Sequence, residues 1–188
     1  DKNLNYKFGT MSNETVIAQT FSKEMAAEYG AVTGNIPSGQ IFQSSGVQAN
    51  LHRTPYNARN HEHYSEDAIL TAYQAAACIA AGKEYGCIIA PKHFAFNDTE
   101  INRSGIATFM TEQKARENEL RGTQASVEDA QTLGMMTTFN QNRMYCRECT
   151  LWSADEYSPQ RMGIPGADVR RLYPGCKLQC VKRSGTLW

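Results

Sequence analysis

Two polar loops carry most of the side chains that could bind a ligand. The first, residues 50–67, reads NLHRTPYNARNHEHYSED, and the second, residues 91–103, reads PKHFAFNDTEINR. Lys92 and His93 are adjacent and offer several hydrogen-bond donors aimed at one point, and Arg59 adds a planar fork that can hold two neighbouring hydroxyls. The same residue types also suit a solvated surface or ion pairs, so the residues alone leave both interpretations open.

A second candidate site lies near the C-terminus. Cys146 and Cys149 form a C-x-x-C pair, and Cys176 and Cys180 follow as C-x-x-x-C. Four thiolates at this spacing fall within the range of structural zinc sites. Zinc ribbons place glycine and hairpin strands about each pair, and these patterns are missing here. We therefore expect no metal site and keep a zinc-stabilised tail as the alternative.

Two amphipathic helices are predicted beside the loops. Ser12 can cap the first, whose inner face would hold Ile17, Phe21, Met25 and Tyr29. Ser65 can cap the second, and Gly82 would end it. The inner face of this second helix is predicted to consist of Ile69, Ala72, Tyr73, Ala76 and Ala80.

Short apolar runs between the helical patterns predict buried strands. Residues 46–52, 86–90 and 134–139 are such runs, and further helical patterns occupy 111–121 and 126–132. Alternating strands and helices imply parallel βαβ units. In such sheets the chemistry gathers at the carboxyl ends of the strands, which is where both polar loops begin.

Composition excludes several classes of partner. The 188 residues are 41% hydrophobic and 20% charged, with a net charge of zero, so nothing favours nucleic acid or a membrane surface. We expect no cofactor. Neither a secretory signal nor an apolar run of about 20 residues is visible, which favours a cytoplasmic protein, although the sequence starts at Asp1 rather than at a methionine.

The two loops together resemble glycoside hydrolase family 3, the β-glucosidase-like enzymes, in their N-terminal barrel domain. One family motif is N-(I/L)-x-R-x-P-x-x-G-R-x-x-E-x-(F/Y)-(S/G)-E-D, and the other is K-H-F-x-x-N-x-x-E-x-x-R. The first is matched here at Asn50, Leu51, Arg53, Pro55, Arg59, Glu62, Tyr64, Ser65, Glu66 and Asp67. The second is matched at Lys92, His93, Phe94, Asn97, Glu100 and Arg103. Ala58 stands where the family has glycine, and the resemblance spans about residues 10–140.

The resemblance implies a partial (β/α)8 TIM-type barrel, incomplete at both ends, with an irregular C-terminal tail. It implies that Arg59, Lys92 and His93 grip the hydroxyls of the terminal sugar and that Phe139 supplies an aromatic from a later strand. Glu100 and Arg103 would instead form an ion pair that braces the loop. The second loop does not resemble that of the branch acting on N-acetylglucosamine. A β-linked gluco- or xylo-oligosaccharide or glycoside is therefore the expected partner.

The implied reaction is retaining hydrolysis by an Asp nucleophile and a Glu acid/base. In the family the motif that carries the nucleophile follows the strand at 134–139, and this chain lacks it. Residues 143–146, read one base later, can encode Gly-Cys-Thr-Ala, and residues 161–166 can encode Glu-Trp-Gly-Phe-x-Gly. Both are family motifs in the correct order, and the same shift at residues 171–172 can place an Asp at the nucleophile's position.

We therefore expect a one-base frameshift at about Asn140. Residues 1–140 would be part of the barrel domain, and residues 141–188 an irregular tail translated out of frame. A fragment of this kind would bind sugar weakly and contain no catalytic residue. The alternatives are an intact hydrolase that recruits Glu148, Asp155 or Glu156, and a zinc-stabilised sugar-binding or interaction module that uses the Cys pairs.

Overall fold

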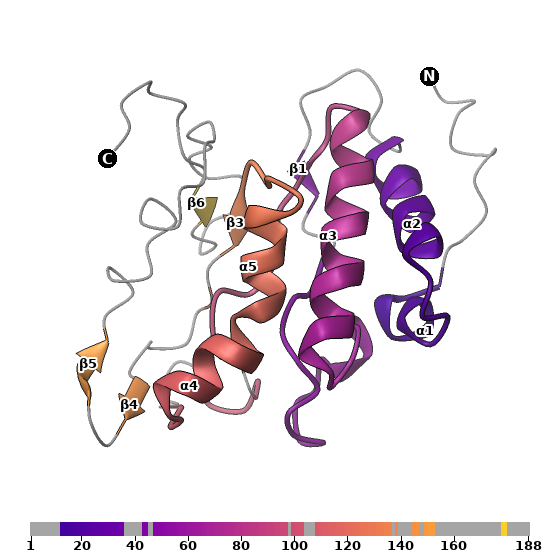
Figure 1. The fold of residues 1–188 in the computed structure, drawn as a ribbon. Helices are drawn as coiled ribbons and strands as arrows, with labels where there is room; N and C mark the ends of the chain where they lie inside the picture. Colours follow the sequence, from indigo (N-terminus) through magenta and orange to yellow (C-terminus); the bar gives the residue numbers. More distant parts are fainter. Residues whose placement is uncertain are drawn as a thin grey trace, which may run out of the picture.

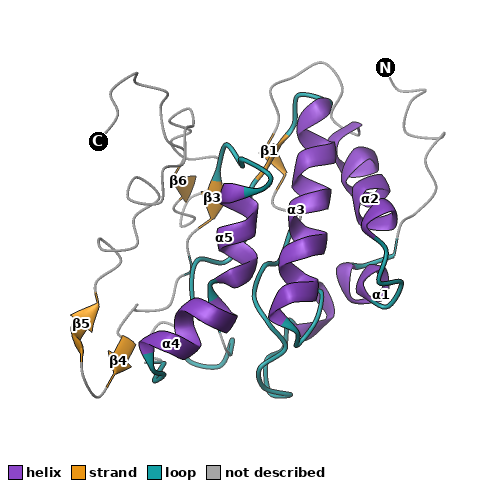
Figure 2. Cartoon of the chain, in the orientation of Figure 1, coloured by secondary structure: helices purple, strands orange, loops and turns teal. Residues whose placement is uncertain are grey.

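The chain places a layer of helices against short parallel strands. The computed structural model describes residues 12–35, 47–97, 99–103, 108–136 and 138, together with short strands at 43–44, 144–146, 149–152 and 178–179. Helices α2 (Lys23–Asn35), α3 (Ala68–Glu84) and α5 (Arg121–Glu128) lie side by side (Figure 1). Helix is the commonest regular structure in this part of the chain (Figure 2), and none of its helices is long and apolar enough to cross a membrane.

The first predicted helix is broken in two. Helix α1 (Glu14–Ala18) is capped by Asn13, whose side-chain oxygen accepts from the Val16 N–H, so the predicted cap at Ser12 is one residue too early. Helix α2 begins at Lys23 after Ser22, whose hydroxyl accepts from the Met25 N–H. Between the two helices Phe21 has a φ of 52° and is 74% exposed. Its placement on the inner face was therefore wrong, because the apolar spacing assumed an unbroken helix.

The cap of helix α3 (Ala68–Glu84) lies two residues after the predicted cap, and the helix buries a different face. Asp67, rather than Ser65, caps it by accepting from the Leu70 N–H at 2.6 Å. Of the predicted inner face, Ala72 and Ala76 are buried, but Ile69 is 62% exposed and Tyr73 is also exposed. The helix is rich in alanine and apolar almost all round, so its periodicity does not single out one face.

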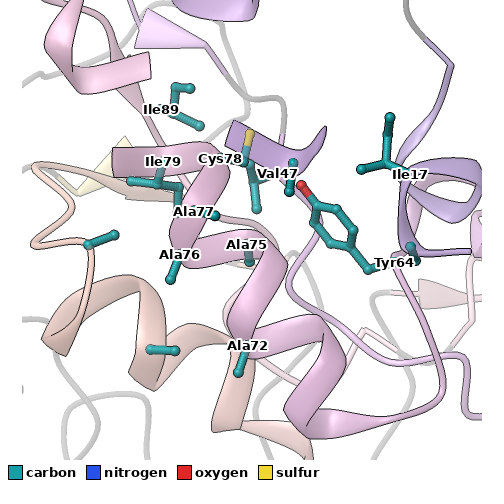
Figure 3. Packing of buried hydrophobic residues seen from close by; sticks show 14 of the residues in the cluster. Ile17, Val47, Tyr64, Ala72, Ala75, Ala76, Ala77, Cys78, Ile79 and Ile89 are labelled. Atoms are coloured by element: carbon teal, nitrogen blue, oxygen red, sulfur yellow. The ribbon is translucent and has the colours of Figure 1, made fainter. Parts of the chain in front are cut away.

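Helices α2 and α3 meet through glycines. A Cβ built on Gly30 would overlap the backbone carbonyl of Cys78, and one built on Gly34 would approach Gly82. We call Gly30, Gly34, Cys78 and Gly82 the helix interface. Figure 3 shows the adjoining apolar core, which shares Cys78 with the helix interface and includes Ile17, Val47, Tyr64, Ala72, Ala75, Ala76, Ala77, Ile79 and Ile89.

Parallel strand pairing connects the segments that precede the polar loops. Strand β1 (Gln43–Ser44) pairs in parallel with β2 (Ile88–Ile89), which confirms the predicted buried strand at 86–90. Beyond β1 the pairing continues, since Lys92 N–H donates to the Val47 carbonyl and the Ala49 N–H donates to the Lys92 carbonyl, both at 2.8 Å. Helix α3 connects these two segments and completes a βαβ unit.

A third segment continues the sheet on the other side. Strand β3 comprises Met135–Met136. Phe94 N–H donates to the Met136 carbonyl at 2.8 Å, and Thr138 N–H donates to the Phe94 carbonyl at 2.7 Å, the alternation of a parallel pair. The described strands group into three two-stranded sheets and do not close a barrel, so the predicted partial barrel is not confirmed by the strand pattern.

The remaining elements differ from the prediction mainly in their bounds. Helix α4 (Glu112–Lys114) continues through a π-helix (Ala115–Glu119) towards α5, where two separate helices were expected. Within the predicted irregular tail, β4 (Met144–Cys146) and β5 (Cys149–Trp152) pair antiparallel, and β6 (Leu178–Gln179) pairs antiparallel with β3. The tail therefore contains three short strands that the sequence patterns did not indicate.

Candidate functional site

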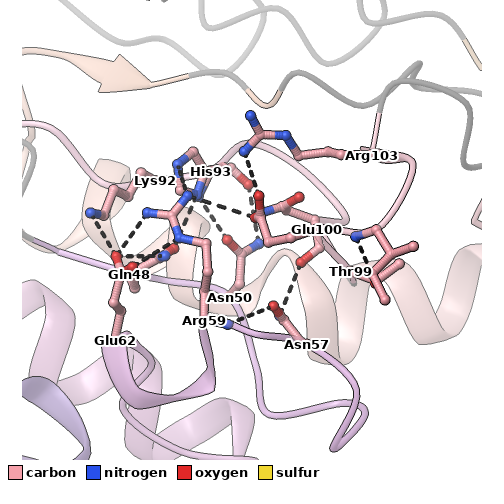
Figure 4. A network of polar contacts seen from close by, with 12 residues as sticks. Gln48, Asn50, Asn57, Arg59, Glu62, Lys92, His93, Thr99, Glu100 and Arg103 are labelled. Carbon is pink, nitrogen blue, oxygen red and sulfur yellow. Dashed lines mark hydrogen bonds and ion pairs between the residues drawn. The ribbon is translucent and has the colours of Figure 1, made fainter.

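Side-chain amides join the two polar loops at the carboxyl ends of the strands. Asn50 holds the backbone of His93 at two points: its Oδ1 accepts from the His93 N–H at 2.7 Å, and its Nδ2 donates to the His93 carbonyl at 3.1 Å. Asn57 Nδ2 donates to the Asn97 carbonyl at 3.3 Å. The expectation that the two loops come together is therefore met, and Figure 4 shows the resulting group of side chains.

Glu62 lies at the centre of this group. It ends a 3₁₀ turn (Asn60–Glu62) and accepts two hydrogen bonds from Arg59, Nε to Oε1 and Nη2 to Oε2, each 2.8 Å. Lys92 Nζ donates to Oε2 at 3.0 Å. Burial acts to raise the pKa of Glu62, but the hydrogen bonds from Arg59 and Lys92 outweigh it and hold the pKa well below its usual range. Glu62 is therefore ionised at neutral pH.

His93 lies behind the ion pairs and is only 6% exposed. Burial, followed by the charges of Arg59 and Lys92, lowers the pKa of His93 to about 3, so the ring is neutral at physiological pH. Its Nε2 lies 3.1 Å from Arg59 Nη1, and its Nδ1 lies 3.2 Å from Gln48 Oε1. Gln48 Nε2 in turn donates to Glu62 Oε2 at 3.2 Å. We call Gln48, Arg59, Glu62, Lys92 and His93 the polar network.

A second ion pair braces the loop that follows Lys92. Arg103 Nη1 donates to Glu100 Oε2 at 2.8 Å, and Asn97 Nδ2 donates to Glu100 Oε1 at 3.0 Å. Glu100 Oε1 also lies 3.8 Å from Arg59 Nη1, so the two ion pairs are linked. The structure thus contains the Glu100–Arg103 ion pair that was expected in place of a direct sugar contact.

The two histidines of the first loop have different environments. The side chain of His61 is 66% exposed, as a surface residue should be. His63 is fully buried, its ring stacks on His52, and burial lowers its pKa to about 4. Its Nδ1–H donates to the Leu51 carbonyl at 3.2 Å. Alternating histidines in a polar loop suit the surface, but only His61 follows that expectation, because the 3₁₀ turn directs His63 into the protein.

Three of the four predicted sugar-binding residues lie together. Arg59, Lys92 and His93 are joined through Glu62 and Gln48, whereas Phe139 lies outside the described residues. Sequence reasoning missed Gln48 as part of the site. A signal was present, because Gln48 and Asn50 are two residues apart in the predicted strand at 46–52, and such side chains point to the same side of a sheet.

The predicted zinc alternative remains a prediction. Cys146 and Cys149 lie opposite each other in the β4–β5 pair, but only their backbone is described, and Cys176 and Cys180 fall outside the described residues. Among the residues that the structure does describe, no group of three or more His, Cys, Asp or Glu side chains could hold a metal ion.

Comparisons with known proteins point to one group of enzymes. No protein-family model matches the chain. It is 32% identical to a β-glucosidase of Ruminococcus albus over 81% of this chain and 36% identical to one of Rhizobium radiobacter over 80%. These matches cover 16% and 18% of those proteins, so the chain spans about a sixth of the length of these relatives.

Solved structures give the same result. β-Glucosidase 3B from Thermotoga neapolitana, in complex with α-D-glucose, matches 84% of this chain and 22% of its own with a TM-score of 0.73 and 28% identity. A β-glucosidase from Streptomyces venezuelae, in complex with D-glucose, matches 69% of this chain and 17% of its own with a TM-score of 0.64 and 30% identity.

Proposed function

The chain is related to the β-glucosidases of glycoside hydrolase family 3, as its motifs predict, and from this premise we propose that its polar network binds the terminal sugar of a β-glycoside. The sugar would be the gluco- or xylo-configured end of an oligosaccharide or glycoside. One observation carries the proposal: Lys92 is anchored to Glu62 by one N–H, and within the described part of the chain its other two N–H groups have no hydrogen-bond partner.

The charge arrangement supports a role in binding hydroxyls. Arg59 and Lys92 share the Glu62 carboxylate, which keeps both side chains in place and leaves donors over for a ligand. A sugar hydroxyl is neutral and can accept a hydrogen bond from such a donor. Its binding therefore does not carry the cost of desolvating a charged ligand group. His93 is neutral and contacts Arg59, so it adds no further positive charge to the site.

The carboxylates of the polar network and its brace are engaged in holding cations. Glu62 has a pKa well below its usual range, so it carries no proton to give to a leaving group, and Glu100 pairs with Arg103. Retaining hydrolysis requires a nucleophilic carboxylate and an acid about 5 to 5.5 Å apart. We therefore propose that this chain binds sugar but does not hydrolyse it, as part of a retaining glycosidase whose catalytic carboxylates lie beyond the frame break.

The parallel pairing of three successive segments supports residues 1–140 as part of a (β/α)8 barrel domain. For residues 141–188 we propose out-of-frame translation, and the zinc-stabilised module remains its alternative. Sequencing the DNA through codon 140 separates the two. Codons at 143–146 and 161–166 that cannot yield the family motifs one base later contradict the frameshift, whereas one bound zinc per chain by elemental analysis supports the alternative.

Binding can be tested directly on the 188-residue chain. D-Glucose, titrated while amide NMR signals are recorded, is expected to shift the signals of Lys92 and His93 in the wild type. The shifts should be lost in Lys92→Ala and retained in Lys114→Ala, which removes an exposed lysine of helix α4. Equal responses in both variants contradict the assignment of the site, and turnover of an aryl β-glucoside contradicts the lack of hydrolysis. D-Xylose in a parallel titration separates the two sugar configurations.

A further inference from the structure

We propose that Gln48 is a positioning residue: it holds the ring of His93 with the proton on Nδ1 and links that ring to the Glu62 carboxylate. The proposal deepens the proposed function, on which its consequence for sugar binding rests. Gln48 lies outside both sequence motifs, is fully buried, and contacts the ring of His93 with one end of its amide and Glu62 with the other.

The polarity of each contact follows from its neighbours. A guanidinium group only donates, so the contact of Arg59 Nη1 with His93 Nε2 requires that Nε2 accept. A neutral imidazole that accepts at Nε2 carries its proton on Nδ1, and this N–H points at Gln48 Oε1. At the other end an ionised Glu62 only accepts, so the amide nitrogen of Gln48 must face it.

The two ends of Gln48 therefore require the same amide orientation. The Nδ1–H of His93 needs an acceptor, which is the amide oxygen, and the Glu62 carboxylate needs a donor, which is the amide nitrogen. One amide orientation satisfies both contacts. Arg59 donates to His93 as well as to Glu62, so the hydrogen bonds form a closed ring through these four residues. None of the buried side-chain nitrogen or oxygen atoms of these four residues lacks a hydrogen-bond partner, which is the condition for a buried polar group to order a site rather than weaken it.

Gln48 and Asn50 divide the task of holding His93. Asn50 fixes the His93 backbone by two hydrogen bonds, and Gln48 fixes the plane of the ring. A substitution at Gln48 should therefore change the protonation and orientation of the His93 ring while leaving the path of its loop in place. A residue that merely fills space would change neither.

The test measures His93 by NMR in the full chain labelled with ¹⁵N-histidine. The wild type is expected to show a neutral ring with the proton on Nδ1 between pH 5 and 8. Gln48→Glu places a carboxylate against the Nδ1–H and should raise the pKa of His93 by at least one unit, because a negative neighbour favours the imidazolium. Gln113→Leu, on an exposed position of helix α4, is the matched control for Gln48→Leu.

Gln48→Leu removes both contacts at similar volume. It is expected to weaken D-glucose binding about 3- to 10-fold and to broaden the His93 signals, while Gln113→Leu changes neither. A proton on Nε2 in the wild type overturns the proposal, and so does an unchanged His93 pKa in Gln48→Glu. The wild-type measurement can therefore contradict the proposal even if a variant fails to fold. Absence of glucose binding by a wild type with the expected ring state would contradict the proposed function alone.

Discussion

The helix interface and the polar network are held together by opposite means. In the helix interface Gly30 and Gly34 let two backbones approach so closely that a single added carbon would overlap Cys78 or Gly82. In the polar network Glu62 accepts hydrogen bonds from Arg59, Lys92 and Gln48, and Arg59 also contacts His93. These contacts measure 2.8 to 3.2 Å. The first region should therefore be sensitive to volume and indifferent to pH. The second should be sensitive to charge and tolerant of small changes in volume.

The largest effect is expected at the helix interface. Gly30→Ala adds a Cβ against the Cys78 carbonyl, a backbone atom that cannot move without displacing α3. Overpacking of this kind costs about 3 kcal/mol, which exceeds the roughly 1 kcal/mol that alanine gains in helix propensity. Urea unfolding should show the loss at every pH between 5 and 8. Glu28→Ala, exposed on the same helix, is the control, and a Gly30→Ala chain as stable as this control would refute the close contact.

In the polar network the effect should depend on charge. Glu62→Gln keeps the shape but leaves Arg59 and Lys92 without their shared carboxylate, and a loss of about 2 kcal/mol is expected at pH 7. The folded-state pKa of Glu62 is lowered, so its stabilisation is present above the ordinary pKa of 4.5 and disappears as the pH falls below it. Wild type and variant should therefore converge in acid. A constant difference from pH 7 to pH 3 would contradict the ion-pair origin, and Glu117→Gln provides an exposed control.

Glu14 connects the two regions. It is the first residue of α1 and is buried. Its carboxyl group hydrogen bonds to Tyr29 of α2, and the charges of Lys92 and Glu62 affect its pKa. Burial is the largest cause that raises its pKa to about 7 from the ordinary 4.5. Because the fold disfavours the ionised form, wild-type stability should fall as the pH rises from about 4.5 to about 7, by about 1 to 2 kcal/mol.

Glu14→Gln removes this titration. The variant should match the wild type near pH 5 and be the more stable of the two at pH 8, as measured by urea unfolding at both values. Glu84→Gln, exposed at the end of α3, should leave the pH profile unchanged. If the stability difference between the wild type and Glu14→Gln were the same at pH 5 and pH 8, Glu14 would ionise freely in the folded chain.

The sequence predicted which residues come together in the polar network better than it predicted the structure around them. Arg59, Lys92 and His93 were found because a motif fixes residue types at fixed spacing, and the short apolar run around β2 favoured a buried strand. Gln48 was missed because its role depends on Glu62 and His93, which are 14 and 45 residues away in the chain.

Errors in the helices have a different cause. The face of α3 could not be read from its pattern, because alanine is equally compatible with core and surface. His63 is buried by the 3₁₀ turn that precedes it, and the break at Phe21 depends on a positive φ that its residue type disfavours. In each case tertiary packing, rather than a local preference visible in the sequence, decided the outcome.

The smallest loss of stability is expected at an ion pair outside the polar network, between Arg116 and Glu112. Its distance is similar to those in the polar network, but its exposure is greater. Arg116 Nε donates to Glu112 Oε1 at 2.7 Å, which is shorter than any contact to Glu62, but both side chains are about half exposed. Arg116→Ala should cost no more than about 0.5 kcal/mol in urea unfolding, because solvent and salt screen exposed pairs. The difference should vanish in 1 M NaCl, whereas that of Glu62→Gln should largely persist. If the two variants responded equally to salt, burial would not be what separates the polar network from an ordinary surface.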